Sequence, residues 1–110
     1  MRRWYGRLCR SGEIGFVRRR GRRIALPTLT AYAVVDRAGR LQVAVATATP
    51  VGHAVVRNRV RRRVRGALDS LAPGPPLSAR VVLVAKPAAA SAPYARIAAD
   101  VFTVLERLAA

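Results

Sequence analysis

The sequence predicts a single α+β domain, an α/β sandwich in which helices cover one central sheet. Its 110 residues suit one domain with one core. Hydrophobic residues make up 52% of the chain and fall in periodic blocks, which is typical of a globular fold. The blocks follow the order helix, two or three strands, helix, strand, helix, without a repeat or a domain linker. We therefore expect residues 1–110 to form one domain.

The first helix is expected to be capped by Ser11 and to end at Gly21. The first 23 residues hold nine arginines and one acid, which superficially resembles an organelle transit peptide. A folded segment is favoured instead, because four side chains here look like packing residues: Trp4, Ile14, Phe16 and Val17.

Residues 30–48 are predicted to form two strands around a turn at Asp36–Gly39. In the second strand, side chains alternate between two faces, with Leu41, Val43 and Val45 on one and Gln42, Ala44 and Ala46 on the other. A short strand in the preceding segment "RRIAL" is possible, and Pro27 would stop it. We expect this part of the chain to build one side of the sheet.

A second helix is predicted from about Ala54 to Leu71, because the Pro- and Gly-rich residues 73–76 force an end. The unbroken apolar run at 79–85 is typical of a strand covered on both faces. Pro93 suits the first turn of a closing helix. Five apolar residues then follow helical spacing: Ile97, Val101, Val104, Leu105 and Leu108.

The formal net charge of +16, from 21 basic and 5 acidic residues, indicates a polyanionic partner. An Arg-rich codon bias could explain why Lys86 is the only lysine, but it does not explain the scarcity of acids. A lone cysteine, Cys9, excludes an internal disulfide and fits a reducing compartment. No apolar run approaches the length of a membrane span.

The second helix concentrates six arginines between Arg57 and Arg65. Its apolar residues form one stripe: Val56, Val60, Val64, Ala67, Leu68 and Leu71. Arg61 lies one turn from Arg57 and one from Arg65, and no acid between positions 54 and 67 offsets these like charges. A merely solvated helix is therefore disfavoured, and a phosphate backbone is the expected partner. Arg63 projects close to the stripe, so it must snorkel outward or reach a partner.

The titratable residues form no catalytic or metal-binding set. The five acids are scattered over different predicted elements: Glu13, Asp36, Asp69, Asp100 and Glu106. His53 is the only histidine and Cys9 the only thiol, which leaves no zinc set. Phosphodiester hydrolysis needs clustered carboxylates or a positioned acid–base pair. We expect no catalytic residue and no metal ligand in this chain, and His53 is expected to help cap the helix or to touch phosphate.

The segment "VGHAVVRNRVRRRVRGAL", residues 51–68, resembles the signature of the bacterial ribonuclease P protein family, Gly-Asn-Ala-Val-x-Arg-Asn-Arg-x-Lys-Arg-x-x-Arg. Eight positions match: Gly52, Ala54, Val55, Arg57, Asn58, Arg59, Arg62 and Arg65. Arg61 stands in place of the usual lysine. A weaker similarity covers most of the chain, through the helix end at Gly21, the aromatic strand position at Tyr32, the strand ending in "AKPA", and Tyr94 before the closing helix.

The resemblance implies that residues 1–110 are one RNA-binding domain, the protein subunit of the cytoplasmic ribonuclease P endonuclease. In that enzyme a catalytic RNA removes the 5′ leader of precursor tRNA with Mg²⁺ held mainly by the RNA, and no membrane or further protein partner is required. The implied RNA-binding residues are Arg57, Asn58, Arg59, Arg61, Arg62, Arg65 and His53. The implied leader cleft contains Tyr32, Phe16, Arg18 and Arg19. The family fold also implies a left-handed crossover into the arginine helix, against the usual rule.

The chain departs from the family pattern at several positions. Residues 48–50 replace a usual Ser-Lys-Lys, and His53 replaces an asparagine. Ile14 and Arg18 stand where the family's first helix commonly carries two aromatics, so leader binding is expected to rest more on charge than on stacking.

Two other functions are compatible with a strongly basic chain. A basic ribosomal or architectural RNA-binding protein of similar fold is the main alternative. Asn58 disfavours it, because a generic phosphate binder needs no asparagine between its arginines. A membrane-active cationic peptide is disfavoured because a Pro-rich segment ends the helix and the apolar stripe suits a sheet.

Overall fold

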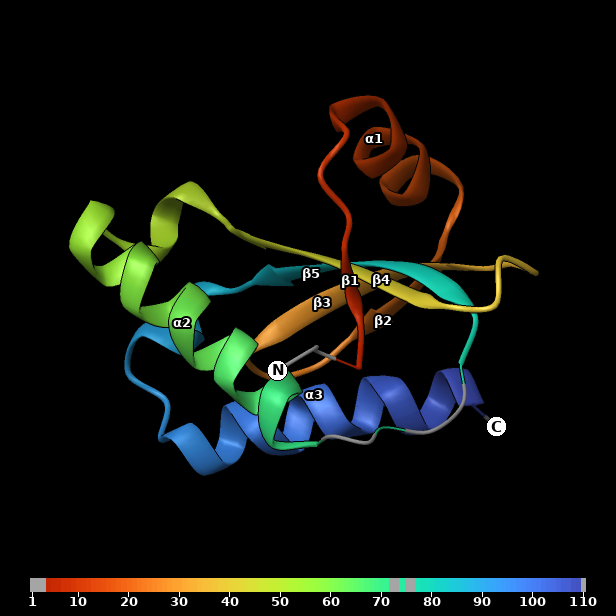
Figure 1. Ribbon diagram of the computed structural model, residues 1–110. Coiled ribbons are helices and arrows are strands. Elements are labelled where there is room, and N and C mark those ends of the chain that lie inside the picture. Colours follow the sequence, from red (N-terminus) through yellow and green to blue (C-terminus); the bar gives the residue numbers. More distant parts are fainter. Residues whose placement is uncertain (1–3, 72–73, 75–76, 110) are drawn as a thin grey trace.

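The computed structural model describes residues 4–71, 74 and 77–109 (Figure 1). In chain order its elements are β1 (Gly6–Arg7), α1 (Ser11–Arg20), β2 (Arg22–Ala25), β3 (Leu29–Val35), β4 (Leu41–Thr47), the 3-10 helix η1 (Thr49–Val51), α2 (Ala54–Ser70), β5 (Ala79–Ala85), the 3-10 helix η2 (Pro87–Ala90) and α3 (Tyr94–Ala109). The strands form one sheet in the order β1-β4-β5-β3-β2. The predicted α+β sandwich is confirmed. The predicted Pro-rich helix end at 73–76 lies outside the described residues, apart from Gly74.

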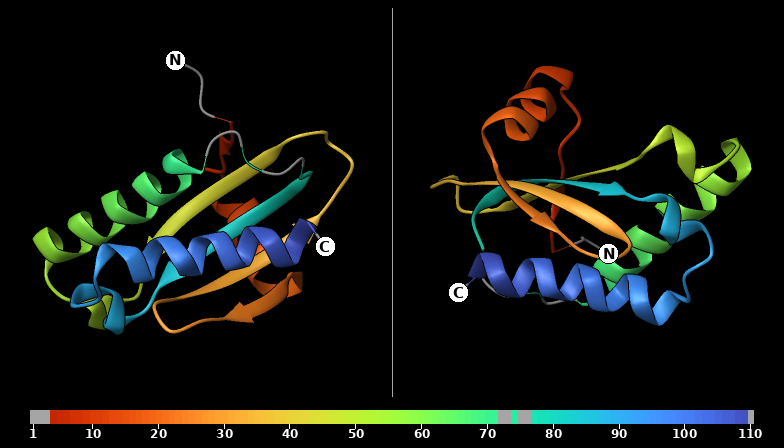
Figure 2. Two further views of the ribbon diagram at one scale, coloured as in Figure 1. Left: turned by 90° about the horizontal axis from the view of Figure 1, so that it is seen from below. Right: turned by 180° about the vertical axis from the view of Figure 1, so that it is seen from behind.

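The sheet separates two apolar layers (Figures 1 and 2). The larger core lies between the sheet and the helices α2 and α3, and it includes Leu41 and Val43 of β4. The smaller core lies under α1, where Val17 packs with Ala44 and Val82. The alternation predicted for β4 is therefore confirmed, because successive side chains enter different cores.

The strands β4 and β5 are parallel neighbours, although α2 separates them in the chain. The left view of Figure 2 has α2 and α3 toward the viewer, with β4 and β5 running the same way. When that view is turned so that both strands point upward, β5 lies to the left of β4. The β4–α2–β5 crossover is therefore left-handed, opposite to the usual hand.

The N-terminal end of α1 differs from the prediction, and its C-terminal end does not. Arg10 occupies the cap position with extended backbone and no side-chain cap bond, so the expected Ser11 cap is wrong and Ser11 is the first helical residue. Gly21 follows the last turn with a φ of −75°. Close packing explains this glycine, because a Cβ there would lie 2.4 Å from the Val17 carbonyl oxygen and 2.9 Å from backbone atoms of Ala33.

Residues before α1 form a short edge strand that the sequence did not predict. In β1, Gly6 and Arg7 run parallel to β4, and the Leu8 amide donates to the Val43 carbonyl at 3.0 Å. A strand of two residues is too short to leave a periodic pattern.

A buried carboxylate joins α3 to the β2–β3 turn. Asp100 is 3% exposed, and its Oδ2 accepts hydrogen bonds from the Thr28 amide at 2.9 Å and the Thr28 hydroxyl at 2.6 Å. These bonds satisfy a charge that burial would otherwise make costly. Among the described residues, no helix combines the length and apolar character needed to cross a membrane.

Candidate nucleic-acid interface

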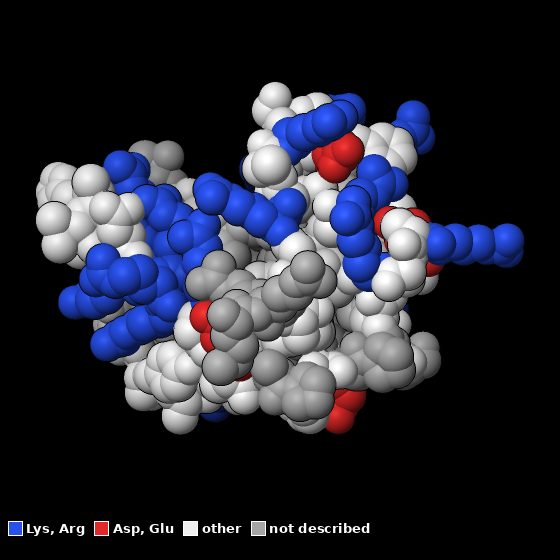
Figure 3. Space-filling view, in the orientation of Figure 1, with Lys and Arg blue, Asp and Glu red and all other residues white. Residues whose placement is uncertain are grey.

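The apolar stripe of α2 faces the core, which leaves its arginines outside. Val60, Val64, Ala67 and Leu68 are buried against the sheet and α3. Val56 and Leu71 pack half-buried at the ends of the same stripe, so the predicted stripe is confirmed. Figure 3 shows basic side chains gathered over α2, with further basic groups toward α1.

The cations of α2 differ in burial and in their neighbours. Arg57, Arg61 and Arg65 follow each other at four-residue spacing and are half-buried, whereas Asn58 and Arg62 are exposed. We call the first three the arginine ridge. No carboxylate in the described part of the chain forms an ion pair with any ridge residue. Arg80 and Asp36 form an ion pair elsewhere, at 3.5 Å.

Asn58 orients one arginine of the ridge. Its Oδ1 accepts a hydrogen bond from Arg61 Nη2, and Arg61 Nη1 donates to Thr47 Oγ1 of β4 at 3.3 Å. An amide oxygen fixes the guanidinium without neutralising it, which an acid at this position would do. Asn58 therefore has a positioning role that the sequence did not reveal.

Two arginines on the other edge of α2 contact the connection between η2 and α3. Arg59 Nη2 donates to the Ala90 carbonyl at 3.0 Å, and Arg63 Nη1 donates to the Ala92 carbonyl at 3.3 Å. Of the two outcomes expected for Arg63, snorkelling outward or reaching a partner, the structure shows the second. Arg59 is exposed and keeps further N–H donors for an external ligand.

The start of α2 explains the motif glycine but corrects the expectation for His53. Gly52 has a φ of +147°, a conformation that L side chains rarely adopt, and a Cβ there would lie 3.1 Å from Val56 Cβ. His53 occupies the N-cap, and its carbonyl accepts from the Arg57 amide at 3.0 Å. Its exposed side chain makes no cap bond, so only its backbone contributes to capping.

On the opposite sheet face, the structure brings together two of the four predicted leader residues. Tyr32 is half-buried beside the small core under α1, and the Arg18 guanidinium lies over its ring, 5.5 Å from the centroid. Beyond this pair, Val84 lies between Thr30 and Ala46 in neighbouring strands. Val84 and Ala46 are half-buried, so α1 leaves this row of the sheet partly uncovered.

Phe16 and Arg19 lie apart from that pair. Residues 16 and 18 are about 200° apart around a helix, so they occupy opposite flanks of α1. Phe16 is 39% exposed and packs against the Arg80 guanidinium, which is 5.3 Å from the ring centroid. Arg19 is exposed and folds back over Gly15. Arg80 was not predicted, because its place beside Phe16 depends on how α1 crosses β5.

A family model described as Ribonuclease P matches residues 5–109. The chain belongs to the ribonuclease P protein family. It is 41% identical over 105 residues to the ribonuclease P protein component of Acidothermus cellulolyticus, covering 93% of this chain and 87% of that protein. It is 38% identical over 107 residues to that of Mycobacterium sp. strain KMS, covering 92% and 87%.

Solved structures of ribonuclease P proteins share the fold. The protein from Thermotoga maritima superposes with a TM-score of 0.81 at 13% identity, covering 92% of this chain and 96% of that one. The protein from Staphylococcus aureus gives a TM-score of 0.77 at 15% identity, covering 99% and 92%.

Family membership establishes the general activity. Ribonuclease P proteins act with an RNA subunit in processing the 5′ end of tRNA, so this chain is a component of that endoribonuclease. The alternative of a ribosomal or architectural RNA-binding protein is thereby set aside.

Proposed function

We propose that the exposed side of α2 binds the catalytic RNA of ribonuclease P and that this RNA carries the chemistry. The contacts come from Arg57, Asn58, Arg59, Arg61, Arg62, Arg65 and His53. One observation carries the proposal: α2 buries its apolar stripe while its arginine ridge meets no carboxylate of the described residues. An RNA backbone supplies the missing negative charge.

The leader of precursor tRNA lies along the sheet face beside α1. Tyr32 and Arg18 form the inner contact, because a guanidinium plane stacks on bases much as an aromatic ring does. Arg18 then serves in place of the aromatic residue that the family commonly carries there. Phe16 and Arg19, on or near the other flank of α1, contribute an outer contact if the leader passes over that helix.

Mg²⁺ is held by the RNA in this proposal. The described residues offer no group of three His, Cys, Asp or Glu side chains that could hold the ion without the RNA. The complex works in the cytoplasm, where an unpaired Cys9 is stable, and it needs neither a membrane nor a further protein.

The proposal is tested by adding the protein to a bacterial ribonuclease P RNA at low Mg²⁺ concentration. We expect stimulated cleavage of precursor tRNA, a weaker effect from an Arg57→Ala, Arg62→Ala double variant, and full stimulation by Arg107→Ala. Arg107 is an exposed arginine in the last turn of α3, so this control removes charge away from α2. Equal stimulation by all three proteins would move the RNA-binding face elsewhere.

A further inference from the structure

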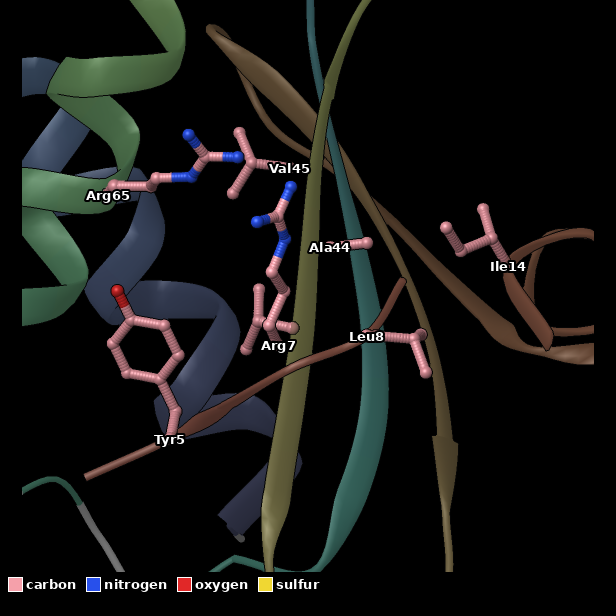
Figure 4. A pocket seen from close by; sticks show the side chains of 8 residues that line it. Tyr5, Arg7, Leu8, Ile14, Ala44, Val45 and Arg65 are labelled. Atoms are coloured by element: carbon pink, nitrogen blue, oxygen red, sulfur yellow. The ribbon is translucent and has the colours of Figure 1, made fainter. Parts of the chain in front are cut away.

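A pocket of about 270 Å³ lies at the outer edge of β4. Arg7 of β1 and Arg65 of α2 line it, with Val43 and Val45 of β4 as apolar neighbours. In Figure 4 the two arginine side chains extend from different elements toward one another beside β4. Nothing in the sequence pairs these residues, because they meet only through the placement of β1.

The chain on both sides of Arg7 is anchored. On one side, the Leu8 amide donates to the Val43 carbonyl at 3.0 Å. On the other, Trp4 Nε1 donates to the Leu68 carbonyl of α2 at 2.7 Å. Leu68 lies on α2, less than one turn from Arg65. The fold therefore holds the backbone of Arg7 beside the segment of α2 that carries Arg65.

Of the described residues, two arginines and no carboxylate line the pocket; the nearest acid along α2 is Asp69, one turn after Arg65, which accepts a hydrogen bond from the lining residue Tyr5. Neither Arg7 nor Arg65 has an ion pair with any carboxylate in the described ranges. Two like charges that face one pocket repel each other, and the net charge of +16 adds to this repulsion. An anion between them would reverse the sign of the interaction.

We propose that Arg7 and Arg65 together bind one phosphodiester group of RNA. Guanidinium forks match phosphate oxygens in geometry and charge, and two forks can hold one group from both sides. The inference rests on the proposed RNA-binding role of α2, because Arg65 is the last member of the arginine ridge. The phosphodiester comes either from the catalytic RNA, which continues from the ridge, or from precursor tRNA.

The test uses Arg7→Gln, Arg65→Gln and the double variant, with Arg107→Gln as a control of equal charge change. Each single variant should weaken RNA binding by about tenfold, the size of one charge-assisted contact. The double variant should lose little more RNA affinity than either single variant, because both side chains hold the same phosphodiester group. Its slope of log affinity against log salt should fall by roughly 0.7–0.9, the value for a single phosphate.

Two binding measurements identify the source of the phosphate. A loss in affinity for the catalytic RNA alone assigns the group to that RNA, and a loss seen only when the assembled holoenzyme binds precursor tRNA assigns it to the substrate. If the affinity loss of the double variant is the product of the two single losses, and its slope of log affinity against log salt falls by about 1.4–1.8, then each arginine binds a separate phosphate. That result overturns the shared site.

Melting curves with and without inorganic phosphate separate binding from folding. Wild type and Arg107→Gln should gain more stability from phosphate than the double variant does. Equal phosphate stabilisation in all proteins, or a double variant that melts lower without phosphate and binds RNA normally, overturns the proposal. If the Arg7 and Arg65 variants bind RNA normally while Arg57→Ala binds weakly, only this inference fails. If Arg57→Ala also binds normally, the proposed function of α2 fails.

Discussion

Asn58 and Arg61 lie one turn apart on α2 and act as a unit. The amide oxygen of Asn58 holds a guanidinium that also reaches Thr47 of β4. Holding an arginine in one rotamer lowers the entropy lost when it binds a phosphate. If α2 binds RNA as proposed, Asn58 should contribute to RNA affinity both through its own exposed amide and through the order it imposes on Arg61.

A double-mutant cycle tests this coupling. Asn58→Ala and Arg61→Ala should each weaken binding to the catalytic RNA, with a coupling energy of about 1 kcal/mol between them. Asn58→Ala combined with Arg65→Ala should be additive, because no contact joins those two side chains. Additivity in both cycles would show that Asn58 acts independently of Arg61.

Arg57 and Arg59 differ in what their removal does to the fold. Arg57→Ala should weaken RNA binding and leave the free energy of unfolding unchanged. Arg59→Ala should also weaken RNA binding. In addition it removes the hydrogen bond to the Ala90 carbonyl, which should lower the free energy of unfolding by no more than about 1.5 kcal/mol because the bond is exposed. For each lost phosphate contact, the salt slope should fall by roughly 0.7–0.9. Unchanged affinity and slope in both variants would contradict this assignment.

At the scale of elements, helical spacing and proline positions were sufficient to predict α2 and α3, and the unbroken apolar run at 79–85 was sufficient to predict β5. The rotation of α1 over the sheet was not predictable, because Val17 is its one fully buried residue and its other large apolar residues, Ile14 and Phe16, stay partly exposed. The sequence therefore could not show that Phe16 and Arg18 lie on opposite flanks. The partners of Arg59 and Arg63 depend on where η2 packs, which no local pattern encodes.

The two flanks of α1 give a matched comparison for leader binding. Tyr32→Ala should reduce holoenzyme affinity for a long-leader precursor tRNA by about tenfold or more, because base stacking is worth roughly 1–3 kcal/mol. Phe16→Ala, on the far flank, should have a smaller effect. Leaderless substrate should bind both variants normally. A loss for Tyr32→Ala that is equal with and without a leader, together with a lower melting temperature, would identify a packing role only.

Two glycines near the ends of α1 should respond oppositely to alanine. Gly21→Ala should destabilise the fold by about 1–3 kcal/mol, because its Cβ would overlap backbone atoms of Val17 and Ala33. Gly12→Ala should be neutral or stabilise by up to about 1 kcal/mol, since nothing lies within 4 Å of the added methyl and alanine favours helix. Urea unfolding measures both values. Equal stability of the two variants would contradict the close approach at Gly21.

At the scale of the whole molecule, the fold spreads cations over several elements and keeps its acids apart. Figure 3 shows basic groups on α2 and around α1 with few acidic atoms between them. Three of the five acids are engaged in the fold: Asp36 pairs with Arg80, Asp100 accepts from Thr28, and Asp69 accepts from the Tyr5 hydroxyl. The charge balance was evident from composition, whereas the Arg7–Arg65 pocket was not, because it requires β1 to pair with β4.

This separation of acids predicts that the protein alone does not cleave precursor tRNA at any Mg²⁺ concentration. Metal-assisted hydrolysis needs carboxylates that converge on one point, and the described acids lie on different elements without such a group. His53 has no described carboxylate partner that would complete an acid–base pair.

The measurement is a cleavage assay over a range of Mg²⁺ concentrations with the catalytic RNA, the protein, or both. Products should form only where the RNA is present, and the protein should lower the Mg²⁺ that the RNA requires, because its arginines replace cations along the RNA backbone. Cleavage by protein purged of host RNA would show that the chain carries a catalytic site of its own.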